Sequence, residues 1–155
     1  MSLHSLERKQ ILGISLSEAW DFFSSPLNLD QITPPSMHFN IRSDFKKEDR
    51  IHEGMLIHYQ VSPLLGIPLK WTTKITEVDY LNHFADEQLK GPFSFWRHQH
   101  FFEAVEQGVK MTDMVVYVIP GWFLGDVVNM ITVRKKVSAI FNYRAQVLEK
   151  LFPIK

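Results

Sequence analysis

The chain has 155 residues, of which 45% are apolar and 22% charged, the balance of an ordinary globular protein. Its 17 basic and 17 acidic residues cancel, which argues against electrostatic capture of nucleic acid or an anionic membrane. The sequence contains no cysteine, which excludes disulfides and thiolate metal sites and fits a cytoplasmic location. The N-terminus lacks the apolar region of a signal peptide, and no apolar run approaches the ~20 residues that span a bilayer. We expect a single domain over residues 1–155, with no nucleic-acid partner and no stable membrane insertion.

A strand and two short helices are predicted for the first part of the chain. Leu3–Leu12 is predicted as a strand of mixed character at a sheet edge. Ser15 and Glu18 have the spacing of a capping box, in which each side chain binds a free backbone N–H at a helix start. The short aromatic helix that follows ends before Pro26, and a second short helix is expected over Asn28–Thr33.

Strands separated by short turns predict an antiparallel meander for the middle of the chain. Side chains that alternate along a strand share a face. The expected strands are Phe39–Phe45, Met55–Val61, Leu69–Tyr80, the two arms of His83–Phe102 around a Lys90-Gly91-Pro92 turn, and Lys110–Ile119.

The period changes from strand to helix after Pro120-Gly121. A helix over residues 124–151 would be ~40 Å long at ~1.5 Å per residue. It must bury its apolar stripe against the sheet, which makes the chain an α+β protein. The stripe consists of Met130, Val133, Val137, Ile140, Phe141, Leu148 and Leu151.

The segment from His83 to Phe102 has the most unusual pattern in the sequence. Its second arm should direct Arg97 and Gln99 outward, together with Phe95 and Phe101. The first arm should place an aromatic, an acid and an amide on one side, as Phe84, Asp86 and Gln88. The inward set of the second arm is Trp96, His98, His100 and Phe102, either a polar core or the wall of a pocket.

Several motifs carry a resemblance to a known superfamily. They are Pro26-x-Asn28-Leu29-x-x-Ile32-Thr33-Pro34, Gly66-x-Pro68-x-x-Trp71-x-Thr73-x-Ile75, Phe84-x-Asp86-x-Gln88-x-x-Gly91-Pro92-Phe93-x-x-Trp96-x-His98-x-His100-x-Phe102, Asp113-x-Val115-x-Tyr117-x-x-Pro120 and Ile140-Phe141-x-Tyr143-Arg144. With the order of elements, they resemble the helix-grip fold of the START/Bet v-type superfamily, also called SRPBCC. More specifically, the chain resembles bacterial ligand-binding SRPBCC proteins, some of which are labelled cell-division inhibitors. The resemblance implies a curved antiparallel sheet wrapped around the long C-terminal helix, with a deep cavity for hydrophobic small molecules between them.

Two histidines and two carboxylates form the first candidate constellation. In a meander, Asp113 lies on the strand next to His98 and His100, and Asp86 lies on the strand at their other side. Such a set could bind Zn²⁺ or Fe²⁺, or form a hydrogen-bonded network in which each carboxylate fixes a histidine tautomer. It could also perform general acid–base chemistry. We expect the network, with no metal and no cofactor.

Arg144 is a second candidate, because its spacing from Val137 and Leu148 puts a charge on the apolar stripe. A buried charge needs a partner. It could reach Asp86 or Asp113, bind a ligand carboxylate, or turn to the helix edge with its head in water.

Rings with a polar tip can line a cavity and orient a ligand, which favours Tyr59, Trp71, Trp96 and Tyr117 as pocket residues. The apolar loops Leu64-Leu65-Gly66-Ile67 and Trp122-Phe123-Leu124 could form a lid or tuck onto the body. The complete predicted ligand site is Tyr59, Trp71, Asp86, Gln88, Trp96, His98, His100, Phe102, Asp113, Tyr117, Phe141 and Arg144.

The leading hypothesis is a non-enzymatic module that binds a small hydrophobic or amphipathic molecule, lipid-like or aromatic, between sheet and helix. An alternative is an enzyme of cyclase, hydratase or isomerase type, with His98 or His100 as the acid–base and Asp113 beside them. A further alternative is a protein-interaction module that uses the apolar loops.

Overall fold

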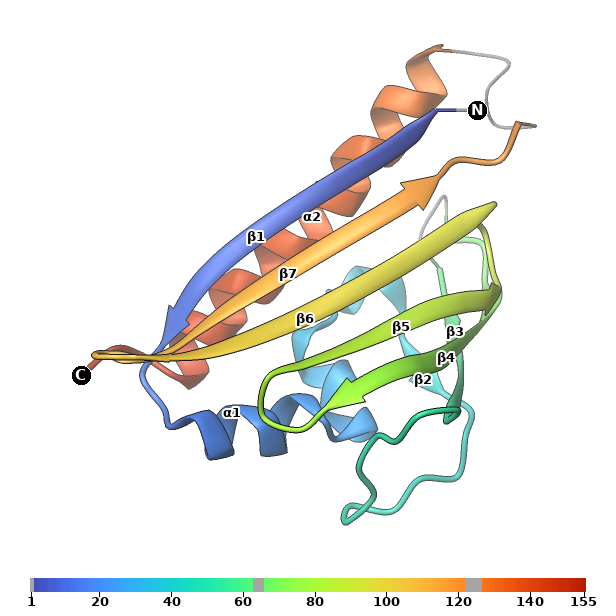
Figure 1. Cartoon of the computed structure of the whole chain (residues 1–155). Helices are drawn as coiled ribbons and strands as arrows, with labels where there is room; N and C mark the ends of the chain where they lie inside the picture. Colours follow the sequence, from blue (N-terminus) through green and yellow to red (C-terminus); the bar gives the residue numbers. More distant parts are fainter. Residues whose placement is uncertain (1, 63–65, 122–126) are drawn as a thin grey trace.

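A computed structural model describes residues 2–62, 66–121 and 127–155 of the chain. One strand is followed by short helices, six strands and one long helix (Figure 1). In chain order the elements are β1 Leu3–Leu12, α1 Leu16–Phe23, the 3₁₀ helices η1 Pro26–Ile32 and η2 Pro35–Met37, β2 Asn40–Ile41, β3 Leu56–Val61, β4 Leu69–Asp79, β5 His83–Lys90, β6 Phe95–Val105, β7 Gly108–Val118 and α2 Val127–Leu151.

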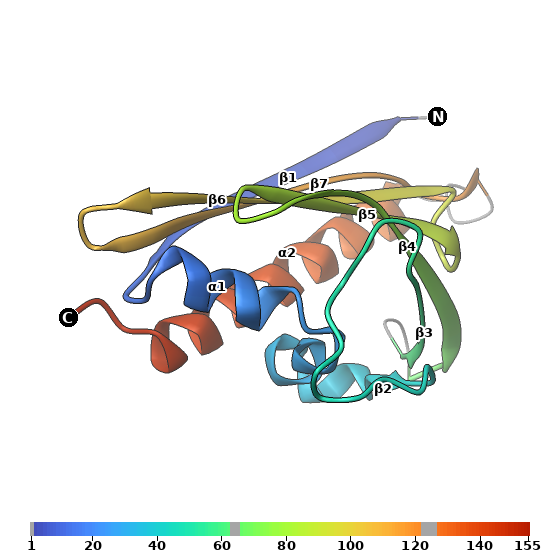
Figure 2. The same cartoon turned by 60° about the horizontal axis from the view of Figure 1, so that its bottom comes forward.

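All seven strands form one antiparallel sheet in the order β1-β7-β6-β5-β4-β3-β2. The strand β1 lies at an edge, as its mixed composition predicts. Figure 2 shows the sheet arching over α2, with β3 and β4 bent toward the side on which the helices lie. The predicted α+β helix-grip architecture is therefore confirmed.

The turn from β1 into the first helix follows the capping prediction. The backbone N–H of Glu18 donates to Ser15 Oγ at 3.1 Å, and the N–H of Ser15 donates to the Glu18 carboxylate at 2.8 Å. The second predicted helix exists as η1, which starts at Pro26 because proline fits the first helical position. These elements place Phe22, Phe23 and η1 under the sheet, next to α2.

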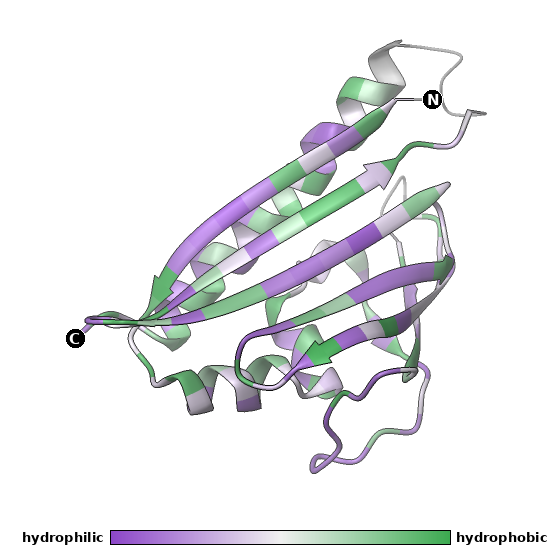
Figure 3. Cartoon of the chain, viewed as in Figure 1, coloured by the Kyte–Doolittle hydropathy of each residue, from purple (hydrophilic) through white to green (hydrophobic). Residues whose placement is uncertain are grey.

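The alternation along β6 places the polar set on the concave face of the sheet. Trp96, His98, His100 and Phe102 are all buried, as predicted. On the opposite face Arg97 forms ion pairs with Glu77 at 2.8 Å and Glu87 at 2.9 Å. Bands of hydrophilic and hydrophobic residues succeed one another along the strands (Figure 3). The inward direction of the histidines, on which a pocket depends, is confirmed.

Two boundary predictions are wrong. The strand expected over Phe39–Phe45 is limited to Asn40–Ile41, because the amides of Arg42 and Ser43 both donate to the carbonyl of His58 and the ladder stops there. The buried stripe also ends earlier than predicted: Leu151, the last residue of α2, is 44% exposed, and Phe152 just after the helix packs against the core instead.

Some predictions fall outside the described residues. They concern Leu64, Leu65 and the segment from Trp122 to Leu124, including the helix start expected at Leu124. Ile67 is described and is exposed. Within the described ranges, neither α2 nor any shorter helix combines the length and hydropathy that a membrane crossing requires.

Candidate ligand-binding site

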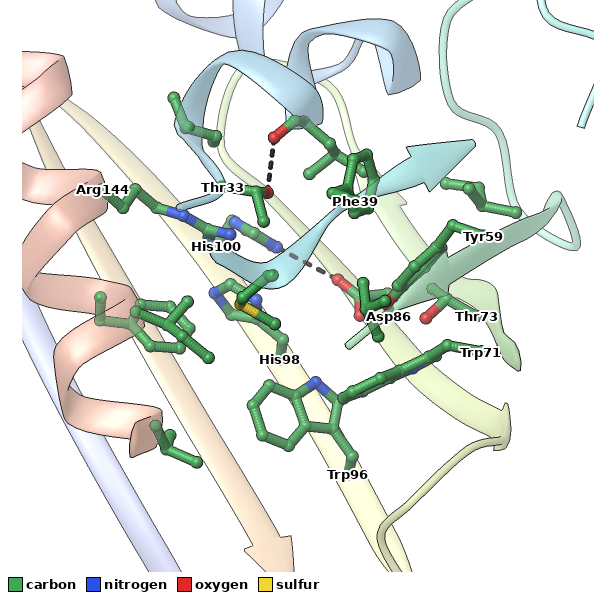
Figure 4. Close-up of a pocket in the computed structure, with 18 of the residues that line it drawn as sticks. Thr33, Phe39, Tyr59, Trp71, Thr73, Asp86, Trp96, His98, His100 and Arg144 are labelled. Carbon is green, nitrogen blue, oxygen red and sulfur yellow. Dashed lines mark hydrogen bonds and ion pairs between the residues drawn. The ribbon is translucent and has the colours of Figure 1, made fainter. Parts of the chain in front are cut away.

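A cavity of about 170 Å³ lies between the concave face of the sheet, η1 and α2. It is smaller than the ~300–1,000 Å³ of common ligand pockets, the size expected from the fold resemblance. Its wall is mostly apolar, with a few polar groups from β5, β6 and α2. Figure 4 shows the labelled wall residues pointing from these elements into a common space.

Most of the predicted site residues line this cavity. They are Tyr59, Trp71, Asp86, Trp96, His98, His100, Phe141 and Arg144. The other four are near but do not line it. Gln88 exchanges hydrogen bonds with the backbone of Phe93 at 2.7 and 3.2 Å, and Phe102 packs against Trp20 and Phe23 in the core.

The remaining two predicted residues support the wall from behind. Tyr117 packs against the rings of Trp96 and Phe93, with centroid distances of 5.7 and 5.4 Å. Asp113 lies behind the two histidines and is almost completely buried. These side chains therefore position the wall rather than face the cavity.

The sequence-based prediction missed the side of the cavity formed by the short helices. This side includes Asn28, Leu29, Ile32, Thr33, Met37 and Phe39, while Phe93, Lys136 and Ile140 add to the opposite wall. Short 3₁₀ segments have no long periodicity from which an inward face can be identified. A usable signal was the apolar content between Leu27 and Phe39, which exceeds what an exposed connection needs.

His98, His100, Asp86 and Asp113 form a continuous buried network. Nε2 of His98 lies 2.8 Å from Asp113 Oδ1, and Nε2 of His100 lies 3.2 Å from Asp86 Oδ2. Because an ionised carboxylate only accepts hydrogen bonds, both ring nitrogens are the donors. Nδ1 of His100 is 3.1 Å from the same Asp113 oxygen, but the angle is too poor for a hydrogen bond. Asp113 thus contacts both rings at once.

Burial and the two carboxylates give the histidines opposite shifts. Burial is the main reason that the pKa of His98 falls to about 4, and the neighbouring His100 lowers it further. Burial alone would also lower the pKa of His100, but the carboxylates of Asp113 and Asp86 beside its two nitrogens outweigh burial and raise that pKa. Burial would raise the pKa of Asp113, yet the two histidines hold it below its usual range. At neutral pH, His98 is a neutral donor and Asp113 is ionised.

Three of these residues are also candidate metal ligands. One ligand atom each from Asp86, His98 and His100 can be chosen within 4.8 Å of one another. The two imidazole rings, however, lie with centroids 3.7 Å apart and planes tilted by 31°. Their Nε2 atoms each face a different carboxylate, whereas metal ligands converge on one point. The geometry fits the hydrogen-bonded network better than it fits a coordination site.

An aromatic wall faces the histidines across the cavity. Tyr59 stacks on Trp71 with centroids 5.7 Å apart, and Trp71 meets Trp96 edge to face at 5.4 Å. Thr73 lies near Tyr59 on the same wall (Figure 4), and burial raises the pKa of the Tyr59 phenol. Nε1 of Trp71 is buried and finds no hydrogen-bond partner within residues 2–62, 66–121 and 127–155. The wall therefore combines a broad apolar surface with one unused N–H donor.

Arg144 extends from α2 toward the histidine pair in Figure 4. Its guanidinium carbon lies 4.8 Å from the ring centroid of Phe141. No carboxylate in the described part of the chain comes within ion-pair distance of Arg144, so the predicted pairs with Asp86 and Asp113 are not present. Its Nε is buried and has no hydrogen-bond partner among the residues that the structure describes, so Arg144 is not simply turned into water.

Comparison with known proteins identifies the fold. No family model and no curated protein sequence match the chain. Among solved structures, Ms6760 from Mycobacterium smegmatis matches 100% of this chain and 98% of its own, with a TM-score of 0.69 and 13% identity. The major latex-like protein 151 of Panax ginseng matches 90% of this chain and 95% of its own, with a TM-score of 0.59 and 12% identity.

The di-domain ARO/CYC protein StfQ of the steffimycin biosynthetic pathway also matches. Its TM-score is 0.71 at 11% identity, and the match covers 96% of this chain and 50% of StfQ. Identities this low show the fold alone. The chain has a helix-grip fold, as its motifs and order of elements predict.

Proposed function

We propose that the protein binds a small hydrophobic or amphipathic molecule in the cavity between the sheet and α2. The observation that carries the proposal is the cavity itself, where apolar side chains surround a few aligned polar groups. A ligand site commonly has this composition, because apolar area provides affinity and fixed polar groups provide orientation. Bound there, the apolar body of the ligand contacts Trp71, Trp96 and Phe141, and its polar end faces His100 and Arg144.

If these residues formed only an ordinary structural core, their packing would be different. A core of this size closes around its side chains and leaves few voids larger than a water molecule. Here the aromatic wall and the histidine pair line one space of about 170 Å³ instead of packing against each other. This unfilled volume, bordered by polar groups that are already fixed by hydrogen bonds, supports binding over a purely structural role.

Binding is tested with the neutral fluorescent probe N-phenyl-1-naphthylamine. We expect saturable binding to the unmodified protein and a loss of at least about tenfold in affinity for Val137→Phe, because the added ring occupies the cavity. Val137 is buried on the cavity wall. Ile131→Phe is the matched control, since Ile131 lies on the exposed side of the same helix. Equal binding by both variants, or no saturable binding at all, would contradict the proposal.

Native mass spectrometry of protein purified from its own host adds an independent test. A co-purifying molecule of defined mass supports ligand binding and shows whether the apolar part of the ligand is lipid-like or aromatic. A bound metal ion in place of an organic molecule would instead favour a coordination site. Loss of the organic adduct in Val137→Phe, with its retention in Ile131→Phe, would place the molecule in this cavity.

A second candidate function is acid–base catalysis on the bound molecule. It is favoured by one observation: the His100 ring lines the cavity while its two nitrogens face Asp86 and Asp113. Because Asp86 also lines the cavity, a proton held on His100 can pass through this carboxylate to or from a ligand C–H or O–H group. Incubation of the identified ligand in D₂O should then place deuterium on its carbon frame with the unmodified protein and much more slowly with His100→Gln. Absence of exchange would leave binding as the function.

A further inference from the structure

The cavity wall contains buried donors that no described residue of the chain uses. Buried side-chain atoms without a hydrogen-bond partner include Nε1 of Trp71 and Nε of Arg144, both in residues that line the cavity. Each of these atoms is an N–H donor and cannot accept. Nδ1 of His100 also lacks a hydrogen bond, but Asp113 is 3.1 Å away. An unused buried donor is unfavourable, so a bound molecule that offers acceptors gains by meeting these two groups.

Arg144 needs a partner more than Trp71 does, because the arginine also bears a charge. A guanidinium remains protonated at all ordinary pH values. The carboxylates nearest to the cavity, Asp86 and Asp113, are committed to His100 and His98, and neither pairs with Arg144. The face of Phe141 offers a weak attraction at 4.8 Å but does not accept a hydrogen bond from the buried Nε–H. Within the described residues the arginine therefore lacks a counter-ion.

The electrostatic environment around this arginine suits an anion. Burial is the main cause that raises the pKa of the Tyr59 phenol, while among the nearby charges Asp86 raises this pKa and Arg144 lowers it. The positive charge of Arg144 therefore acts inside the cavity. Lys136 lies eight residues earlier on α2 and also lines the cavity, with its side chain exposed. Residues spaced by four and eight share a helix face, so both cations point to the same side of α2. The acids of the site lie on the sheet instead.

We propose that the ligand is an amphipathic acid, whose anionic group binds to the Arg144 guanidinium while its apolar body lies against the aromatic wall. The inference rests on the proposed binding function and names the class of ligand that it serves. An oxyanion matches the planar fork of a guanidinium and accepts two parallel hydrogen bonds from it. A carboxylate is the smallest such group, which suits a cavity of about 170 Å³. The unused N–H of Trp71 would meet a second acceptor on the body of the ligand.

The test uses pairs of ligands that share an apolar body and differ in charge. Octanoic acid is compared with 1-octanol, and 2-naphthoic acid with 2-naphthalenemethanol, by isothermal titration calorimetry at pH 7. We expect at least one acid to bind the unmodified protein about tenfold or more tightly than its alcohol. The pair that shows this preference distinguishes a lipid-like body from an aromatic one.

Variants then identify the cation. Arg144→Met should bring the affinities of acid and alcohol close to equality, mainly through weaker binding of the acid. Arg134→Met is the matched control on the exposed side of α2 and should keep the preference. Arg144→Lys keeps the charge without the fork and should keep part of the preference, which provides a result if Arg144→Met does not fold.

Three outcomes separate the inference from the function on which it rests. Alcohols that bind as tightly as acids overturn the acidic ligand and leave hydrophobic binding intact. A preference that survives Arg144→Met but disappears in Lys136→Met places the anion at the exposed amine and also overturns it. Failure of acids, alcohols and N-phenyl-1-naphthylamine alike removes the binding function itself, and the inference with it.

Discussion

At the scale of single residues, Asp113 controls the polar end of the site without lining it. One of its oxygens is 2.8 Å from Nε2 of His98 and 3.1 Å from Nδ1 of His100. This arrangement fixes the His98 tautomer, since the nitrogen that faces an ionised carboxylate must carry the proton. It also keeps His100 between two negative groups, Asp113 and Asp86. The two histidines are therefore chemically different although they lie two residues apart on one strand.

The difference predicts a pH dependence of stability that belongs to His98. Burial lowers the pKa of His98 from 6.5 to about 4 in the native state. Between these values the unfolded chain binds a proton that the native chain does not, so the free energy of unfolding falls by up to about 3 kcal/mol as the pH drops from 6.5 to 4. The pKa of His100 is raised, so its stabilisation is complete below pH 6.5 and is lost only as the pH rises through the raised value.

Urea unfolding at pH 6.5 and pH 4 measures this effect. His98→Gln keeps a donor toward Asp113 but has no titration, so it should lose less stability over this interval than the unmodified protein. His52→Gln, at an exposed histidine, should show the same loss as the unmodified protein. An identical loss in all three proteins would show that burial does not suppress protonation of His98.

At the scale of elements, the β6–β7 hairpin meets the corner between β1 and α1 through a glycine. Gly108 has a φ of +142°, and a Cβ there would lie 2.1 Å from the carbonyl oxygen of Leu12. Both the backbone conformation and the space therefore exclude other residues. This contact sets the pairing of β1 with β7, on which the concave face depends.

Gly108→Ala is expected to lower the free energy of unfolding by about 3 kcal/mol, from positive-φ strain combined with a clash against backbone. Gly121→Ala is the matched control, because a Cβ there meets no atom of the described chain within 4 Å and its φ is not positive. The control should be within about 0.5 kcal/mol of the unmodified protein in urea unfolding. Similar stability of both variants would contradict the close approach at Leu12.

The elements also show which parts of the site the sequence could predict. Strict alternation along β6 identified the inward histidines, because one side of a half-buried strand must be apolar or fixed by partners. Alternation could not separate residues that face the cavity from residues that support it. Tyr117 and Asp113 share the inner face of β7, yet they touch β6 side chains instead of the cavity. That distinction depends on side-chain length and sheet curvature, which sequence spacing does not contain.

The side of the cavity formed by η1 and η2 marks the other limit of prediction. Ile32 and Met37 line the cavity from 3₁₀ segments that each begin with a proline, and Phe39 lies just beyond them. Which of these side chains turns inward depends on where α2 packs, through contacts between distant parts of the chain. The predicted strand at Phe39–Phe45 failed for a related reason. Among the described residues of this segment, Asn40 and Ile41 pair with β3 in the regular ladder, and the bonds of Arg42 and Ser43 to His58 break the register.

At the scale of the whole molecule, the cavity couples binding to stability. The sheet and α2 enclose a space that the chain does not fill, and a native core with an unfilled cavity is less stable than a filled one. A molecule that binds the native state alone adds RT ln(1 + [L]/Kd) to the free energy of unfolding, about 2.7 kcal/mol at a concentration of 100 Kd. The apparent stability of the protein should therefore depend on what occupies the cavity.

This coupling predicts that a mutation that fills the cavity removes the stabilisation by a bound ligand. With N-phenyl-1-naphthylamine at 100 Kd, urea unfolding followed by far-UV circular dichroism should show a gain of about 2.7 kcal/mol for the unmodified protein. Val137→Phe should gain little at the same concentration, because its ring already occupies the space beside Phe141 and Ile140. Ile131→Phe should respond like the unmodified protein. Equal stabilisation of Val137→Phe would mean that the probe binds elsewhere, and that the space between sheet and helix is a packing defect with no role in binding.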